Sequence, residues 1–207
     1  VSSAVVCSIC GSLTDGLYVP PIVTTFTEPD FYAGVEAYWA ERHGASSPAY
    51  LNEDVACVLW GQLSLETGWD GGACHNYNVG NHKKTPGQLY TSFSTYEDFP
   101  TEDAARAQVK CEHATLGTWV NGKMRVFVRP PHSMSHFAVF GSLSEGLGGH
   151  ITLLGKPLYA ASLAALTEHA SGRAASASRS TRRERVQALA AVFAPPLKPY
   201  ALAANYV

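Results

Sequence analysis

A single carboxylate stands at the end of an apolar helical pattern in this chain. Val55, Leu59 and Leu63 recur at helical spacing. Glu66 takes the next position of the same stripe. A partly buried carboxyl group is harder to ionise, so it holds the proton that a general acid must donate at neutral pH. Glu66 is therefore the first candidate for acid–base chemistry in the sequence.

The segment that follows Glu66 is rich in side chains that suit a carbohydrate. Trp69 offers an apolar wall, and the stretch CHNYNVGNHKK adds Tyr77, Asn78 and further amides. A sugar presents hydroxyl and acetamide edges together with apolar ring faces, which amide and aromatic side chains match. The competing interpretation is a helix-end glutamate that simply reaches solvent. For an isolated glutamate this second interpretation is the more common one, so the rest of the chain has to decide.

The composition limits the classes of protein. The chain has 207 residues, of which 46% are hydrophobic and 15% charged, with a formal net charge of −2. This length accommodates one domain with a substantial core and a small lobe or tail. The charge gives no reason to expect a nucleic-acid partner. Because no stretch approaches the ~18 consecutive apolar residues of a membrane span, we expect none.

Metal-ligating residue types are present without the spacing of a metal site. Cys7 and Cys10 form a C-x-x-C pair, but no second pair of ligands follows at finger spacing. His132 and His136 have i, i+4 spacing, yet they follow two prolines and have no glutamate between them. We therefore expect no metal and no cofactor, and the pairing of the five cysteines stays open.

Helical patterns and capping residues predict two helices in the first third of the chain. Asp30 is expected to cap a helix over residues 31–44. Asn52 is expected to cap a second helix that carries Glu66 and stops at Gly68.

The middle of the chain changes to β character. Residues 118–128, TWVNGKMRVFV, alternate around Asn121-Gly122, which predicts a β-hairpin. Strand or aromatic loop structure is expected at residues 88–99, and a helix over residues 102–113.

The helical period returns over residues 142–170, where Ser142 or Ser144 is a suitable N-cap. Residues 171–185 are small, polar and basic, which indicates a surface connection, and residues 185–193 predict a last short helix. The whole pattern indicates an α+β fold, with a mainly helical body and a small β-hairpin lobe.

Four ordered elements carry a family resemblance. The first is Glu66-Thr67-Gly68-Trp69, and the second is the loop that runs from Asn78 to Lys83. The third is the hairpin at residues 118–128. The fourth combines several short motifs, namely Phe137-Ala-Val-Phe140, Ser142-Leu-Ser-Glu-Gly146, Leu153-Leu154 and Tyr159.

Together these elements resemble the bacterial glucosaminidase family, the lysozyme-like cell-wall hydrolases that include flagellar muramidases and autolysins. The resemblance spans residues 52–166 and does not cover residues 1–50 or 170–207. It implies a lysozyme-like α+β domain. The domain prediction that follows is an N-terminal arm and first helix at 1–48, a catalytic domain at 49–170, and a basic linker with a C-terminal helix and tail at 171–207.

By this resemblance, Glu66 is the general acid that protonates the glycosidic oxygen of peptidoglycan. A glycoside hydrolase usually needs a second carboxylate. Glu112 is the first candidate because it is nearest to the hairpin, ahead of Glu97 and Asp98. The side chains expected to bind substrate are Trp69, Tyr77, Asn78, Tyr96, Phe137 and Tyr159.

Several alternatives stay open at this point. Glu66 alone would serve a lytic transglycosylase, in which the sugar's own 6-hydroxyl attacks, or a hydrolysis assisted by the N-acetyl group. A catalytically inactive peptidoglycan-binding component of a phage virion or secretion machine is the other class. In every case the expected partner is the glycan strand, with a larger virion or secretion assembly as a further partner. Since peptidoglycan lies outside the cytoplasm, we expect a secreted, periplasmic or virion-associated protein.

Overall fold

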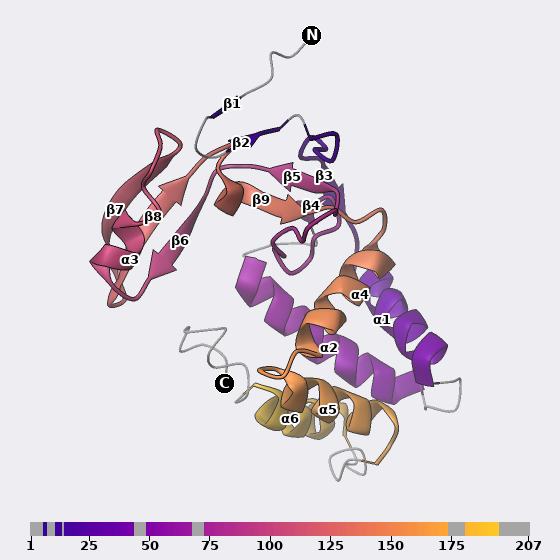
Figure 1. Ribbon diagram of the computed structural model, residues 1–207. Coiled ribbons are helices and arrows are strands. Elements are labelled where there is room, and N and C mark those ends of the chain that lie inside the picture. The colour runs from indigo at the N-terminus through magenta and orange to yellow at the C-terminus, as the bar shows by residue number, and fades with distance from the viewer. Residues whose placement is uncertain are drawn as a thin grey trace. The chain divides into compact units, whose positions relative to one another are not determined.

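The chain divides into two compact units, each made from two separate stretches of sequence (Figure 1). The β unit comprises Val1–Ile22 and His82–Val139, and the helical unit comprises Val23–Asn81 and Phe140–Val207. The structure is a computed structural model, and it describes residues 6–7, 11–13, 15–43, 49–67, 73–173 and 181–194.

The helical unit consists of helices and one two-stranded antiparallel sheet. Its elements are β3 (Val23–Thr25), α1 (Glu28–His43), α2 (Ala49–Thr67), β4 (Ala73–His75), α4 (Leu143–Leu154), α5 (Ala160–Ala170) and α6 (Arg182–Phe193). Among the described residues of the chain, no helix is long and apolar enough to cross a membrane.

The β unit is built from short antiparallel sheets and one small helix. Its elements are β1 (Val6–Cys7), β2 (Gly11–Ser12), β5 (Tyr90–Ser92), β6 (Thr95–Phe99), α3 (Glu102–Arg106), β7 (Ala114–Val120), β8 (Lys123–Val128), the 3-10 turn η1 (Ser133–Ser135) and β9 (His136–Ala138). Helices and antiparallel sheets in one chain confirm the predicted α+β class.

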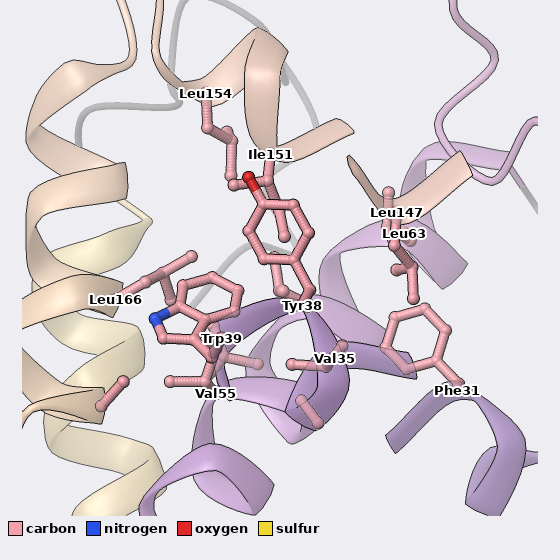
Figure 2. Close-up of a cluster of buried hydrophobic side chains, with 14 of the residues drawn as sticks. Phe31, Val35, Tyr38, Trp39, Val55, Leu63, Leu147, Ile151, Leu154 and Leu166 are labelled. Atoms are coloured by element: carbon pink, nitrogen blue, oxygen red, sulfur yellow. The ribbon is translucent and has the colours of Figure 1, made fainter. Parts of the chain in front are cut away.

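Helix α2 forms the centre of the helical unit, where it packs against α1, α5 and α6. A helix with neighbours on several sides is apolar around much of its circumference. Val55, Leu59 and Leu63 are fully buried there, beside aromatic side chains of α1 such as Phe31 and Trp39 (Figure 2). Each large apolar side chain buried in this way contributes about 1.5–3 kcal/mol. The apolar residues of α2 that precede Glu66 on the same face of the helix are therefore buried in the core.

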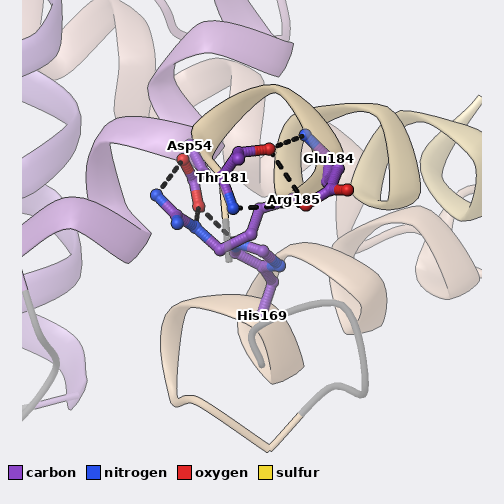
Figure 3. Close-up of polar contacts among 5 residues, drawn as sticks. All are labelled: Asp54, His169, Thr181, Glu184 and Arg185. Carbon is purple, nitrogen blue, oxygen red and sulfur yellow. Dashed lines mark hydrogen bonds and ion pairs between the residues drawn. The ribbon is translucent and has the colours of Figure 1, made fainter. Parts of the chain in front are cut away.

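A buried carboxylate joins three helices of this unit. Asp54 of α2 is fully buried, and its Oδ2 accepts a hydrogen bond from Nε of Arg185 at 2.6 Å (Figure 3). The same oxygen lies 3.0 Å from Nε2 of His169 on α5. Arg185 also donates from Nη2 to Oδ1 at 3.3 Å, and the hydrogen bonds to this carboxylate raise the pKa of the guanidinium. The contacts of this one carboxylate thus fix α5 and α6 to α2.

Both predicted helix starts differ from the structure. Helix α1 begins at Glu28, because Thr27 Oγ1 accepts a hydrogen bond from the Asp30 N–H at 3.2 Å and the Asp30 carboxylate accepts one from the Thr27 N–H at 2.9 Å. This reciprocal arrangement is that of a capping box, which puts Asp30 in the first turn rather than ahead of it. Helix α2 begins at Ala49, so Asn52 lies inside the helix and is buried. The predicted stops at residues 44 and 68 lie outside the described residues.

The predicted hairpin is confirmed. Strands β7 and β8 pair antiparallel, and the turn residues Asn121 and Gly122 have positive φ values of 49° and 74°. Two successive positive φ values are the requirement of a type I′ turn, which Asn-Gly meets at little cost. Strand β6 pairs with the other edge of β8, so the sheet order is β6-β8-β7. Strands β5 and β6 confirm the β structure expected at residues 88–99.

The three-stranded sheet has one buried face and one open face. Alternate residues of β8, such as Val126, are buried in a cluster that includes Ala105 of α3. Phe127 therefore points to the opposite face, where it is 50% exposed. Tyr96 of β6 and Thr115 of β7 are its register partners, so these three side chains share the open face.

One predicted helix is shorter in the structure than expected, and another is divided into two. Helix α3 ends at Arg106, so Glu112 lies in the turn before β7 and not on a helix over residues 102–113. The segment 142–170 forms two helices, α4 and α5, with a break at residues 155–159.

The predicted boundaries at 48/49 and 170/171 do not coincide with the division between the two units. Helix α1 shares one core with α2, and α6 packs against both α2 and α5. The three-part organisation along the sequence stays a prediction.

Replacing Asp54 by Asn should destabilise the helical unit strongly, because Arg185 would keep its charge in a buried position without the carboxylate. Removing one partner of a buried ion pair costs about 3–5 kcal/mol. Urea denaturation followed by circular dichroism measures this loss. Arg183→Gln, at an exposed position of α6, is the control, and we expect a change below about 0.5 kcal/mol. An Asp54→Asn protein as stable as the parent would contradict the assigned role.

Two buried histidines make the β unit sensitive to acid. Burial lowers the pKa of both His136 and His132. The ring of His136 lies 4.4 Å from that of Tyr90. The charge of Lys84 lowers the pKa of His136 further, and that of Asp15 opposes this effect. The folded unit therefore holds these rings neutral at a pH where the unfolded chain already protonates them.

The stability of the β unit should fall as the pH drops below about 6.5, the ordinary histidine pKa, since the unfolded state then binds more protons than the folded one. Urea midpoints measured from about pH 7.5 down to about pH 5 test this slope. His136→Gln should flatten the slope. A midpoint that does not change with pH in this window would refute the prediction.

Candidate functional site

Glu66 stands in the last turn of α2, and its side chain lies outside the described residues. One turn earlier, Gln62 is buried, with its Oε1 3.1 Å from Nε2 of His150 on α4. The amide nitrogen of Gln62 has no hydrogen-bond partner within the described part of the chain. A polar pair is therefore built into the core one turn before the candidate acid.

The loop after β4 has an unusual backbone conformation. Asn76 and Tyr77 have positive φ values of 51° and 53°, a region that asparagine visits more readily than tyrosine. The Tyr77 N–H donates to Oγ1 of Thr24 at 2.9 Å, and the Asn78 N–H donates to the carbonyl of His75 at 2.9 Å. Tyr77 is half-buried and Asn78 is 3% exposed. Asn78 thus packs within the loop, and its contact with substrate stays a prediction.

Helix α4 approaches this loop so closely that one of its positions must be glycine. A Cβ at Gly146 would overlap the carbonyl oxygen of Tyr77. Ser142 starts the helix, since its Oγ accepts a hydrogen bond from the Glu145 N–H at 3.2 Å, and it is the N-cap of the two serines considered. The Glu145 carboxylate accepts in turn from the Gly141 N–H at 2.8 Å. Helix α4, which carries the Ser142–Gly146 motif of the resemblance, is therefore in direct contact with Tyr77, the residue that precedes the Asn78–Lys83 loop.

The remaining residues of the helical unit that were predicted to bind substrate are Tyr159 and Trp69. Tyr159 directly precedes α5, is half-buried and packs against the main core. Its carbonyl accepts a hydrogen bond from the Ser162 N–H at 2.9 Å. Trp69 lies outside the described residues.

Phe137 packs inside the β unit. Its ring is 4% exposed and stacks on Phe93, with centroids 4.3 Å apart and an interplanar angle of 5°. The Nζ of Lys83 lies 3.8 Å from the centre of the Phe137 ring and donates to the carbonyl of Met134 at 2.6 Å. These contacts give Phe137 a packing role, and a contact with substrate stays a prediction.

Tyr96 and Glu112 are the two predicted residues that the structure brings to one place, since both line a pocket of about 410 Å³. The Tyr96 ring is 49% exposed, and the guanidinium of Arg125 lies 3.5 Å from its centre. Arg125 is fixed in turn by two hydrogen bonds of 2.8 Å to Asp98, which lower the pKa of that carboxyl group. The Tyr96 ring beside Glu112 is thus held by the guanidinium of Arg125, which Asp98 fixes in turn.

Ion pairing separates the three candidates for the second carboxylate. Glu97 pairs with Lys83 at 2.6 Å, and Asp98 pairs with Arg125. The side chain of Glu112 is 79% exposed, and within the described residues the only basic side chain in ion-pair range is that of His113, whose Nε2 is 4.0 Å from Oε1. Glu112 is therefore the carboxylate among the three whose oxygens are available to a ligand.

The structure brings together several polar groups that were not predicted from the sequence. The Gln62–His150 pair and the contacts of Asp54 link residues far apart in the chain. A polar residue on an apolar stripe is the signal that would have identified Gln62.

Cys111 is disulfide-bonded, whereas Cys57 and Cys74 are free thiols. Among the described residues, no cluster of three or more potential ligands is arranged to hold a metal ion.

Comparisons with known proteins give one structural similarity. No family model and no curated protein matches the chain. A solved structure that it resembles is the C-terminally truncated glycoside hydrolase domain of FlgJ from Salmonella typhimurium, at 22% sequence identity over 79% of this chain and 98% of that one. The TM-score of this match is 0.30.

Replacing Gly146 by Ala should displace the loop at residues 76–80, because the added methyl group would overlap the Tyr77 carbonyl. We expect a loss of about 1–3 kcal/mol, as for other overpacked sites, measured by urea denaturation. Gly148→Ala on the same helix is the matched control, since its Cβ would lie 3.6 Å from the Tyr38 ring, an ordinary contact. That variant should be neutral or more stable, as alanine is the better helix former. Equal stability of the two variants would rule out the close approach.

Proposed function

We propose that this protein is a glycosidase that cleaves the glycan strand of peptidoglycan, with Glu66 as its general acid. The observation that carries the proposal is the position of Glu66 in the last turn of the buried helix α2, within the Glu-Thr-Gly-Trp element that resembles the glucosaminidase family. Both an N-acetylglucosaminidase and a muramidase fit this chemistry.

Two structural observations support the proposal. The Ser142–Gly146 element packs, at Gly146, against the carbonyl of Tyr77, which directly precedes the Asn78–Lys83 loop of the same resemblance. The hairpin expected between them in sequence is present in the β unit. The hairpin and the helix start at Ser142 are thus both formed in the structure.

In the proposed reaction, the protonated Glu66 donates its proton to the glycosidic oxygen while the bond from that oxygen to the anomeric carbon breaks. Glu112 is the proposed second carboxylate. It either accepts a proton from the water that attacks the anomeric carbon, or attacks that carbon itself to form a glycosyl ester. In the second case water, deprotonated by Glu66, then cleaves the ester and releases the sugar. Since the substrate lies outside the cytoplasm, we propose that the protein acts there, as a secreted, periplasmic or virion-associated protein or within a larger virion or secretion assembly.

Glu66→Gln removes the acidic proton and keeps the size of the side chain. It should lower the rate of peptidoglycan cleavage by at least about 10²–10⁴-fold, the usual contribution of a general acid, without lowering the melting temperature. Mass spectrometry of a digest of purified peptidoglycan measures the products. Glu168→Gln, at an exposed position of α5, should cleave as the parent does. Undiminished cleavage by Glu66→Gln would refute the assignment.

The products of the same digest distinguish the mechanisms. Free reducing ends from the parent, lost in both Glu66→Gln and Glu112→Gln, are the expected result for a two-carboxylate hydrolase. Anhydro-ended products, still formed by Glu112→Gln, would instead identify a lytic transglycosylase that uses Glu66 alone. Binding of the polymer by the parent without any product would identify a peptidoglycan-binding component.

A further inference from the structure

The pocket of about 410 Å³ on the β unit has an aromatic side and a charged side. Its volume lies in the range of sites for small organic ligands. Six of the residues that line it are Tyr96, Thr115 and Phe127 from the open face of the sheet, and Glu112, His113 and Arg129 from the end of the strands.

Arg129 brings an available positive charge to this pocket. Its Nη2 donates to the backbone carbonyl of Glu112 at 3.1 Å, which anchors the guanidinium and leaves its other N–H groups free to bind a ligand. Within the described part of the β unit, Arg129 forms no ion pair. The lysines and arginines there that do pair with a carboxylate are Lys83, Lys84, Arg106 and Arg125.

Two aromatic rings are already positioned beside this charge. The Phe127 ring lies on Gly117, where an added Cβ would come within 2.8 Å of it, so a side chain at this position would displace the ring. The Tyr96 ring lies in an edge-to-face arrangement with Phe127, with centroids 6.3 Å apart, and Arg125 covers one of its faces. Rings that are fixed before binding lose little entropy when a ligand packs on them.

We propose that this pocket binds the peptide that peptidoglycan carries, with the terminal carboxylate of the peptide on Arg129. The proposal rests on the proposed function in that it takes peptidoglycan as the substrate. A carboxylate accepts two parallel hydrogen bonds from a guanidinium, which is the most specific contact available to Arg129. The small alkyl side chains of such a peptide pack on Phe127. A bare sugar ring would use the aromatic faces but leave the guanidinium without a partner, whereas a peptide uses both.

The direct test is binding of a soluble stem tetrapeptide, compared with the same tetrapeptide whose terminal carboxylate is replaced by an amide. Isothermal titration calorimetry of the full chain should show affinity for the acid at least about tenfold higher than for the amide, which corresponds to about 1.4 kcal/mol. Arg129→Gln should remove this difference. Arg106→Gln is the matched control, because Arg106 is an exposed arginine of the same unit that pairs with Glu102 and does not line the pocket.

Three results would overturn the proposal. They are no binding of the tetrapeptide by the parent at millimolar concentration, equal affinity for acid and amide, and an unchanged preference for the acid in Arg129→Gln. Circular dichroism of Arg129→Gln verifies that the variant is folded, so a loss of the preference reports on the pocket.

A second experiment separates this proposal from the proposed function. Peptidoglycan stripped of its peptides by an amidase retains the lactyl carboxylates of its sugars. The ratio of kcat/KM on intact glycan to that on stripped glycan should be about tenfold lower in Arg129→Gln than in the parent. A ratio that rises instead, because Arg129→Gln slows cleavage of the stripped glycan alone, would mean that the carboxylate bound is the lactyl group, which is free only after the peptide has been removed. That result, or an unchanged ratio, would overturn the peptide assignment. If the parent binds the tetrapeptide and cleaves neither substrate, the proposed function fails and the pocket assignment stands.

Discussion

The helical unit depends on one buried carboxylate. Apolar side chains alone allow packed helices to shift or repack at modest cost, but the fully buried charge of Asp54 is satisfied only where Arg185 and His169 reach it. Helices α5 and α6 are therefore held to α2 in one arrangement. Glu66 is twelve positions further along the same helix, about 18 Å at 1.5 Å per residue, so contacts at one end of α2 secure the helix that carries the candidate acid at the other.

The charges of the β unit fall into two groups. Most lysines and arginines of its described part pair with a carboxylate. Lys83, for example, contacts a carboxylate, a backbone carbonyl and an aromatic ring. Such charges stabilise the unit and are not available to a ligand. Glu112 and Arg129 differ, since neither has a strong ion pair and both line the same pocket. The distribution of ion pairs thus separates the groups that maintain the fold from the groups that can act on a partner.

Local signals in the sequence predicted the parts of the fold that local chemistry determines. The Asn121-Gly122 turn, the helical spacing around Leu59 and the Ser142 cap all depend on residues a few positions apart, and each is present. Asp54 shows the limit of such signals. Its partner Arg185 is 131 residues away, and no local pattern connects them. The same holds for the pocket, where Arg129 and Tyr96 meet only through strand pairing.

The interleaving of the two units has a consequence for biosynthesis. The second stretch of the β unit, His82–Val139, is translated between the two stretches of the helical unit. A nascent chain therefore carries α1 and α2 without the helices α4, α5 and α6 that complete their core, and Asp54 without Arg185, until the ribosome has synthesised α6. During that interval the strands from Tyr90 to Ala138 already have their partners on the same contiguous stretch. The helical unit is thus the part of the chain that has to be shielded from aggregation while translation continues.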